Sequence, residues 1–184
     1  MRSPGSIRLD TLGHSNRSLE EFVSLLRSGG VERAVDIRRH PGSRKWPHFS
    51  RESLAESLPR DGIEYRWMPE LGGRRAPRPD SPHMAWRSDS FRGYADYLDT
   101  EEGATALEAL FALAAEKPSA IFCAEAVPWR CHRSLVADAL VARGVEVVDL
   151  ISPSSSREHT LPDFARIKDG RVVYDVMREP ELFG

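Results

Sequence analysis

Hydrophobic and polar positions along this chain follow two spacings in turn. Short apolar runs predict strands at 7–13, 32–38, 63–68, 119–125 and 145–151. A helical spacing of apolar residues predicts helices at 19–29, 51–58, 91–99, 104–116 and 131–144. Because strand and helix patterns alternate, the sequence predicts an α/β fold, with a mostly parallel sheet and helices on its faces.

Capping residues strengthen two of the helix predictions. Ser18 stands before an apolar-periodic segment with Glu21 three positions later, which is the spacing of a capping box. Ser50 is the predicted N-cap of the helix at 51–58. Prolines and glycines make 69–90 an irregular excursion, and 170–176 is expected to form a short edge strand whose neighbour in the sheet is not assigned.

The size and composition of the chain are those of an ordinary globular protein. A chain of 184 residues suits one hydrophobic core, so we expect a single domain over 1–184. Hydrophobic residues make up 40% of the chain and charged residues 29%, as is typical of a water-soluble protein. No run approaches the roughly 20 apolar residues of a membrane span, and residues 1–10 lack the apolar centre of a secretory signal. A cytoplasmic protein without a membrane partner is therefore expected.

Charge is unevenly distributed along the chain. The net charge is only -2, which argues against nonspecific nucleic-acid binding. Arginines are nevertheless dense at 38–39, 44, 74–75, 130 and 133, and this local charge favours an anionic ligand. The two cysteines, Cys123 and Cys131, are too few for a disulfide scaffold and are interpreted as free thiols.

Polar clusters follow the predicted strands at the end where a ligand usually binds. In open α/β sheets the binding crevice lies outside the carboxyl ends of the strands. The clusters are GHSNR (13–17), DIRRHPGSR (36–44), ELGGRR (70–75) and CAEAVPWRCHR (123–133). We expect these four loops to converge on one site.

The last of these loops carries the strongest chemistry. Cys131, His132 and Arg133 are predicted to fall in the first turn of a helix, where free amides and the helix dipole favour an anion. With Arg130 and Arg133 nearby, Cys131 would be stabilised as a thiolate. Cys123 is as readily explained by packing within a buried strand as by chemistry.

Two carboxylates are candidates for proton transfer or water activation. Asp36 and Glu125 end different predicted strands, and they would form a pair if those strands are close. Each also has a structural alternative. Asp36 could pair with Arg38 or Arg44, and Glu125 could orient Arg133.

A further set of residues is expected to bind substrate or an anion. It consists of His14, Asn16, Arg38, Ser43, Arg44, Tyr65, Gly72, Gly73, Arg130 and Arg133. Helix capping explains Asn16 as well as substrate binding does. An exposed loop explains Gly72 and Gly73 as well as binding does. The aromatic rings of Tyr65, Trp46, Trp67 and Trp129 could stack on a base or sugar, although packing is their commoner use.

A metal site is the weaker interpretation of the same loop. Cys123, Glu125, Cys131 and His132 carry atoms that could bind a metal. Their spacing matches no familiar ligand pattern, and adjacent residues on a helix project in different directions. No cofactor is predicted, and a divalent metal remains an open alternative.

The motifs in combination resemble a known family. The chain is similar to the bacterial and archaeal proteins grouped as domain of unknown function 488. The similarity lies in TLGHSNRSLEEF (11–22), VDIRRHPGSRKWPHFS (35–50), GIEYRWMPELGGRR (62–75), FRGYADYL (91–98) and CAEAVPWRCHRSLVADAL (123–140). The resemblance implies a three-layer α/β fold with these motifs gathered in one pocket, and it implies no particular reaction. Segment 76–90 matches the pattern least.

Three functions follow from these residues as hypotheses. The first is a hydrolase or group transferase that acts on a phosphorylated, nucleotide-like or nucleic-acid substrate, with Glu125 and Asp36 managing protons or water. The second is cysteine-dependent sulfur or phosphate chemistry, although Arg130 lies seven positions after Cys123 and phosphatase loops place their arginine at six. The third is a noncatalytic module that binds a nucleotide or nucleic acid.

Overall fold

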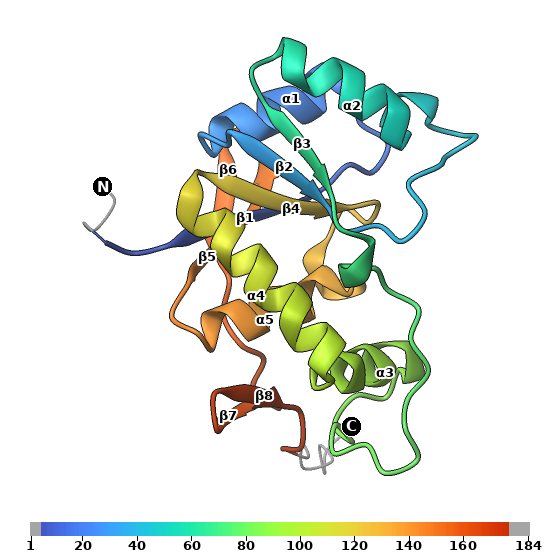
Figure 1. Ribbon diagram of the computed structural model, residues 1–184, viewed down its shortest axis with the longest axis vertical. Coiled ribbons are helices and arrows are strands. Elements are labelled where there is room, and N and C mark those ends of the chain that lie inside the picture. Colours follow the sequence, from blue (N-terminus) through green and yellow to red (C-terminus); the bar gives the residue numbers. More distant parts are fainter. Residues whose placement is uncertain (1–4, 177–184) are drawn as a thin grey trace, which may run out of the picture.

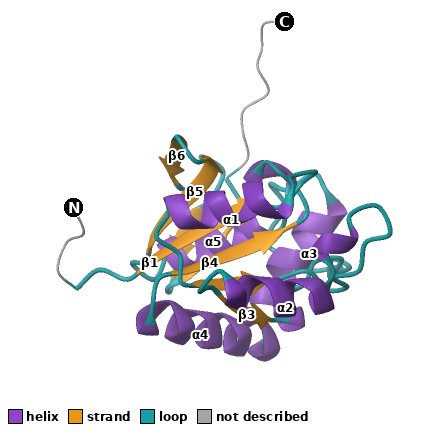
Figure 2. Ribbon diagram, turned by 90° about the horizontal axis from the view of Figure 1, so that it is seen from above, coloured by secondary structure: helices purple, strands orange, loops and turns teal. Residues whose placement is uncertain are grey.

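A six-stranded sheet forms the centre of the computed structural model, which describes residues 5–176. In spatial order its strands are β3 (Glu64–Trp67), β2 (Arg33–Asp36), β4 (Ser119–Cys123), β1 (Arg8–Gly13), β5 (Glu146–Ser152) and β6 (Ser155–Glu158). The first five are parallel, and β6 pairs antiparallel with β5. The predicted mostly parallel sheet is confirmed, and the arrows of β3 and β4 point the same way in Figure 2.

Helices cover both faces of the sheet. One face carries α1 (Leu19–Ser28) and α2 (Arg51–Arg60), and the other carries α3 (Asp89–Leu98), α4 (Glu101–Glu116) and α5 (Arg133–Val141). Figure 1 shows the two groups on opposite sides of the strands. Alternate residues of a strand point to opposite faces, so Ile121 packs in the core under α3–α5 while Phe122 packs under α1 and α2. The expected three-layer α/β fold is present.

The predicted helix caps are confirmed by their hydrogen bonds. Ser18 Oγ accepts a hydrogen bond from the Glu21 amide at 3.1 Å, and the Ser18 amide donates to Glu21 Oε2 at 2.8 Å. Ser50 Oγ accepts from the Ser53 amide at 3.2 Å. Both caps satisfy amides that have no partner within the helix, and they fix where α1 and α2 begin.

Two segments near the site differ from the sequence prediction. Strand β4 ends at Cys123, so Ala124 and Glu125 belong to the loop. Helix α5 begins at Arg133, after a short 3-10 helix at Pro128–Arg130, and Cys131 has extended backbone angles. The prediction that Cys131 lies in the first turn of this helix is therefore wrong. The 3-10 turn closes on the carbonyl of Pro128 and delays the α-helix by two residues.

The C-terminal part also folds differently from the prediction. Segment 170–176 does not form an edge strand of the main sheet. Strands β7 (Arg166–Lys168) and β8 (Arg171–Val173) pair in a separate hairpin, whose turn residues Asp169 and Gly170 both have positive φ. The edge beside β5 is taken by β6, whose four residues are all exposed and so lack the apolar alternation that marks a strand.

Among the residues that the structure describes, no helix has the length and apolar character needed to cross a membrane.

Candidate active site

A pocket of about 510 Å³ opens at the carboxyl ends of the central strands. It is lined by three of the four predicted loops, through residues 38–40, 73–74, 123–125 and 130–132. Ser90 and Phe91, at the start of α3, complete the lining. Phe91 opens the FRGYADYL motif of the family resemblance, and neither residue was among the predicted binding residues. The remaining loop, 13–17, does not line the pocket, but its residue His14 contacts Arg38, which does. The expected convergence at the strand ends is thus largely seen.

Cys123 lies in the wall of this pocket beside a buried arginine. The Cys123 side chain is the last of β4, and only 3% of its surface is exposed. Nη1 of Arg133 donates to Cys123 Sγ at 2.9 Å and to the Glu125 carbonyl at 2.6 Å, and Nη2 donates to the Ala126 carbonyl at 3.1 Å. One guanidinium therefore holds both the sulfur and the loop that follows it.

The surroundings of Cys123 favour its thiolate. Burial by itself raises the pKa of this thiol, but a hydrogen bond from Cys131, together with the charge and hydrogen bond of Arg133, outweighs burial and lowers the pKa to about 7. The neighbouring Cys131 behaves oppositely. Burial and the hydrogen bond and negative charge of Cys123 raise the pKa of Cys131 well above its usual value. The sulfur that carries the charge is therefore that of Cys123.

His132 is held neutral behind the cysteines. Burial, as the main cause, lowers the pKa of His132 to about 4. Its Nε2 lies 3.3 Å from the Ile37 carbonyl. A carbonyl can only accept, so Nε2 carries the proton. Nδ1 is then a free acceptor at 3.6 Å from Cys131 Sγ. A Cβ on Gly73 would come within 2.9 Å of this nitrogen, which explains a glycine at that position.

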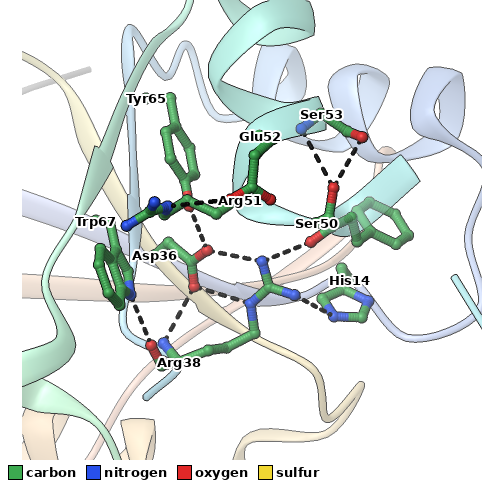
Figure 3. A network of polar contacts seen from close by, with 10 residues as sticks. His14, Asp36, Arg38, Ser50, Arg51, Glu52, Ser53, Tyr65 and Trp67 are labelled. Atoms are coloured by element: carbon green, nitrogen blue, oxygen red, sulfur yellow. Dashed lines mark hydrogen bonds and ion pairs between the residues drawn. The ribbon is translucent and has the colours of Figure 1, made fainter. Parts of the chain in front are cut away.

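A second buried cluster fixes Arg38, which also lines the pocket; Figure 3 shows the polar contacts around this arginine. Asp36 Oδ1 accepts from Nε of Arg38 at 2.8 Å, and Asp36 Oδ2 accepts from Arg38 Nη2 and from the Tyr65 hydroxyl, both at 2.7 Å. This two-pronged pairing is the strongest geometry for arginine and carboxylate. Asp36 has no exposed surface, so its oxygens face Arg38 and Tyr65 rather than the pocket.

His14 supports the same arginine. Burial, the largest cause, lowers the pKa of His14 to about 4. Its Nδ1 is 2.9 Å from the Ser15 carbonyl and therefore carries the proton. This leaves Nε2 to accept from Arg38 Nη1 at 3.3 Å. His14 thus orients Arg38 and does not line the pocket.

The rim of the pocket carries exposed charges. Arg39, Arg74 and Arg130 are exposed, and so is Glu125. Arg39 Nη1 donates to the Arg74 carbonyl at 3.3 Å, which joins two of the converging loops. Three arginines with one carboxylate give the entrance a positive balance that suits an anion.

Several predicted binding residues lie away from the pocket. Asn16 is exposed and lines a separate hollow next to α1. Ser43 Oγ accepts from the Trp46 amide, and Arg44 is exposed on the same loop. Tyr65 bonds to Asp36 as described. Gly72 is buried, and a Cβ there would press on Cβ of Arg39 at 2.7 Å, so it serves loop packing.

The loop after β4 depends on a close backbone approach. An added Cβ on Gly13 would stand 1.7 Å from the Glu125 carbonyl oxygen, which no real structure tolerates. The His14 amide donates to the Cys123 carbonyl and the Ser15 amide to the Ala124 carbonyl, both at 2.9 Å. The end of β1 therefore serves as the platform for residues 123–125.

A buried charge network lies outside the pocket and had no signal in the sequence. Nε2 of His159 is 2.7 Å from Asp138, and its Nδ1 is 3.2 Å from Asp149. The Tyr174 hydroxyl donates to Asp138 at 2.7 Å. Burial lowers the pKa of His159, but the hydrogen bonds of the two carboxylates outweigh this and raise it to about 9. The imidazolium ties the C-terminal segment to α5 and β5.

Metal ligands are not grouped within residues 5–176. No set of three or more His, Cys, Asp or Glu side chains there is arranged to hold an ion. Cys123, Glu125, Cys131 and His132 all reach the same pocket, but they do not form such a set.

Fold and site together define a three-layer α/β protein with a basic pocket built around a buried thiol pair. The family model described as "Domain of unknown function DUF488" matches residues 18–140. The chain therefore belongs to the DUF488 family, as the resemblance indicated. No curated protein and no solved structure matches the chain.

Proposed function

We propose that the protein is a hydrolase or group transferase that binds a phosphorylated or nucleotide-like substrate in this pocket and attacks it with Cys123. One observation carries the proposal: the Cys123 sulfur, which accepts a hydrogen bond from the Arg133 guanidinium at 2.9 Å, lines a pocket rimmed by arginines. A nucleophilic cysteine needs a lowered pKa and a positive environment. Of the three hypotheses from the sequence, this combines the substrate of the first with the nucleophile of the second.

The arginines supply binding and charge stabilisation. Arg39, Arg74 and Arg130 at the rim would bind the anionic group, since guanidinium groups match phosphate oxygens in pairs. Arg38 in the wall, whose donors are mostly committed to Asp36 and His14, would add positive charge. In the phosphoryl case, a bond forms between Cys123 sulfur and phosphorus while the bond from phosphorus to the leaving oxygen breaks. Water or an acceptor hydroxyl then attacks phosphorus, and the thiolate leaves.

The two carboxylates take different parts in this proposal. Glu125 is exposed at the pocket and is the carboxyl placed to donate a proton to the leaving oxygen and later to accept one from water. Asp36 has both oxygens occupied by Arg38 and Tyr65, and we assign it the positioning of Arg38. Asp36 is then not a proton carrier.

The proposal is tested by measuring hydrolysis of an aryl phosphate through the phenolate that it releases. The wild type should hydrolyse it, Cys123→Ser should lose at least ~100-fold of kcat/KM, and Glu125→Gln should lose less with a good leaving group. Mass spectrometry of acid-quenched enzyme should find a phosphoryl group on Cys123.

Two outcomes would overturn this proposal. Turnover that survives in Cys123→Ser with a loss only in Glu125→Gln would establish the carboxylate reaction instead. A rise in melting temperature with nucleotides, short DNA or short RNA, without turnover of phosphorylated compounds, would establish a noncatalytic binding module.

A further inference from the structure

We propose that Cys123 and Cys131 form a reversible dithiol–disulfide couple, in which a hydroperoxide oxidises Cys123 and Cys131 then closes the disulfide. The inference rests on the same nucleophilic Cys123 as the proposed function, and it concerns how that site responds to oxidants. In this inference Cys131, which the sequence predicted as the nucleophile, has a covalent role as the cysteine that closes the disulfide.

Both sulfurs meet at one guanidinium-bearing residue. Arg133 donates from Nη1 to Cys123 Sγ at 2.9 Å and from its backbone amide to Cys131 Sγ at 3.5 Å. Both cysteines are free thiols and both line the pocket. The seven residues between them leave β4 and turn back through the 3-10 helix at Pro128–Arg130, so the chain brings the second sulfur to the first.

The two thiols are electrically unequal, as a nucleophile and its resolving partner need to be. The hydrogen bond between them stabilises negative charge on Cys123 and keeps the proton on Cys131. A peroxide entering the pocket therefore meets a thiolate at Cys123. Cys131 stays protonated, and so unreactive toward peroxide, until its proton is removed.

His132 is placed to take that proton. Its Nδ1 has a free lone pair 3.6 Å from Cys131 Sγ, because Nε2 holds the ring proton toward the Ile37 carbonyl. The ring is neutral, so its lone pair can relay this proton to the hydroxide that leaves Cys123, which is the stronger base. No other use of His132 follows from the proposed reaction, which needs only Cys123, Glu125 and the arginines.

The chemistry balances in two steps. The Cys123 thiolate attacks the peroxide, a sulfur–oxygen bond forms, the oxygen–oxygen bond breaks, and hydroxide or alkoxide leaves with the electron pair of the broken bond. The Cys131 sulfur then attacks the sulfenic sulfur of Cys123, its proton passes to His132, and the departing hydroxide takes that proton to form water. An external dithiol reduces the disulfide to two thiols.

Such a couple would switch off the proposed reaction and protect its nucleophile. A disulfide removes the Cys123 thiolate from the pocket. It also prevents further oxidation to the sulfinic and sulfonic acids, which a dithiol does not reverse. The prediction is that peroxide-treated wild-type protein loses its thiols and regains both with dithiothreitol.

Intact-mass spectrometry during titration of the purified protein with hydrogen peroxide tests the inference. The wild type should lose two hydrogens without gaining oxygen. Cys131→Ser should instead gain one and then more oxygens at Cys123, and Cys123→Ser should react at least ~10-fold more slowly than wild type. Melting temperatures of the reduced variants show whether each is folded, and Cys131→Ala provides a second variant without the thiol.

His132→Gln separates the two steps. It should leave the first oxidation unchanged and slow disulfide closure by ~100-fold, so that dimedone traps the sulfenic acid. The inference is overturned if wild-type protein gains oxygen on Cys123 as Cys131→Ser does, or if Cys123→Ser oxidises at the wild-type rate. Because no substrate is present, failure here is distinct from failure of the proposed turnover, which the aryl phosphate assay reports.

Discussion

Arg133 is an arginine with only 1% of its surface exposed, next to a thiol instead of a carboxylate. Burying a guanidinium costs free energy unless its donors are satisfied. Here Nη1 donates to Cys123 and to the Glu125 carbonyl and Nη2 to the Ala126 carbonyl, while the buried Nε has no partner among the described residues. The charge therefore serves both to stabilise a thiolate and to hold the loop around it.

Replacing Arg133 should raise the pKa of Cys123. Loss of a positive charge at this distance disfavours the thiolate, so Arg133→Met should shift the pKa of Cys123 upward relative to the same protein with Arg133. The measurement is the rate of alkylation by iodoacetamide against pH, made in a Cys131→Ser background so that one thiol reacts. Arg133→Lys is the matched control and should shift less, and an unmoved midpoint in Arg133→Met would refute the role of the charge.

His132 should make the fold sensitive to acid. Its folded pKa of about 4 lies below the unfolded value of 6.5, so the unfolded chain binds the proton more readily as pH falls. The free energy of unfolding should drop by at most about 3 kcal/mol for this residue as pH falls from the unfolded pKa to the folded one. Urea unfolding at pH 7 and pH 4.5 measures it.

In His132→Gln the fall in the free energy of unfolding between pH 7 and pH 4.5 should be smaller by the contribution of His132. The contribution of the carboxylates is the same in both proteins. His14, whose pKa is also about 4, makes a similar contribution to the fall in stability with acid, and both proteins retain it. Parallel stability curves for wild type and His132→Gln would show that His132 is not held neutral in the folded state.

At the scale of elements, the site depends on where β1 and β4 end. The two strands run side by side in register, and Gly13 pairs with Cys123 at their last position. Without a side chain on Gly13, the Glu125 carbonyl lies against the end of β1. The loop that carries the nucleophile is thus set by packing between two backbones.

Gly13→Ala should therefore displace this loop. The new methyl group would overlap the Glu125 carbonyl, and we expect a loss of about 1–3 kcal/mol in the free energy of unfolding together with a raised pKa of Cys123. Gly42→Ala is the control, since a Cβ there meets nothing within 4 Å. The control should change the free energy of unfolding by about 0.5 kcal/mol at most. Equal effects of the two substitutions, measured by urea unfolding, would contradict the close approach.

Across the whole molecule, a buried imidazolium joins segments distant in the sequence. His159 follows β6 and binds Asp138 on α5 and Asp149 on β5, while Tyr174 beyond β8 binds Asp138 as well. Thr11 on β1 donates to Asp149 at 2.7 Å. These bonds hold the C-terminal segment against the body of the domain, and none of the residues that make them lines the pocket.

This network should weaken in alkali. His159 has a folded pKa of about 9, above the unfolded value of 6.5, so its stabilisation is complete below the unfolded pKa and is lost as pH rises through the folded one. The loss is on the order of 3 kcal/mol. Cys123 opposes it in the same range because its folded pKa is depressed, and the measurement therefore uses Cys123→Ser as the background.

In that background, urea unfolding between pH 6.5 and 9.5 should show a falling free energy of unfolding, and adding His159→Gln should flatten the fall while lowering stability at pH 6.5. An unchanged slope in the double variant would mean that His159 is not protonated between the two carboxylates.

The DUF488 pattern and the hydrophobic spacing were sufficient for the architecture because both reflect local rules. Apolar runs of strand length, the helical spacing of apolar residues and capping serines depend on neighbours a few positions away. The parallel sheet, its two helical faces and the position of the pocket therefore followed from residues 7–151. The strand at 155–158 was missed because it is polar throughout and has no apolar alternation. At 166–173 a strand was expected within 170–176, but its hairpin partner at 166–168 was not.

The roles of individual site residues needed the tertiary structure. The sequence by itself determined that Cys123, Cys131, His132, Arg133 and Arg38 belong near the strand ends, since loops after parallel strands meet there. Only the three-dimensional arrangement decided that Cys123 carries the charge, that Asp36 is committed to Arg38, and that Asn16 and Arg44 lie outside the pocket. The physical reason is that pKa values and hydrogen bonds depend on burial and on partners distant in the chain. Two examples are the contact of Arg38 with His14 and the contacts of His159 with Asp138 and Asp149. No local sequence pattern encodes these contacts.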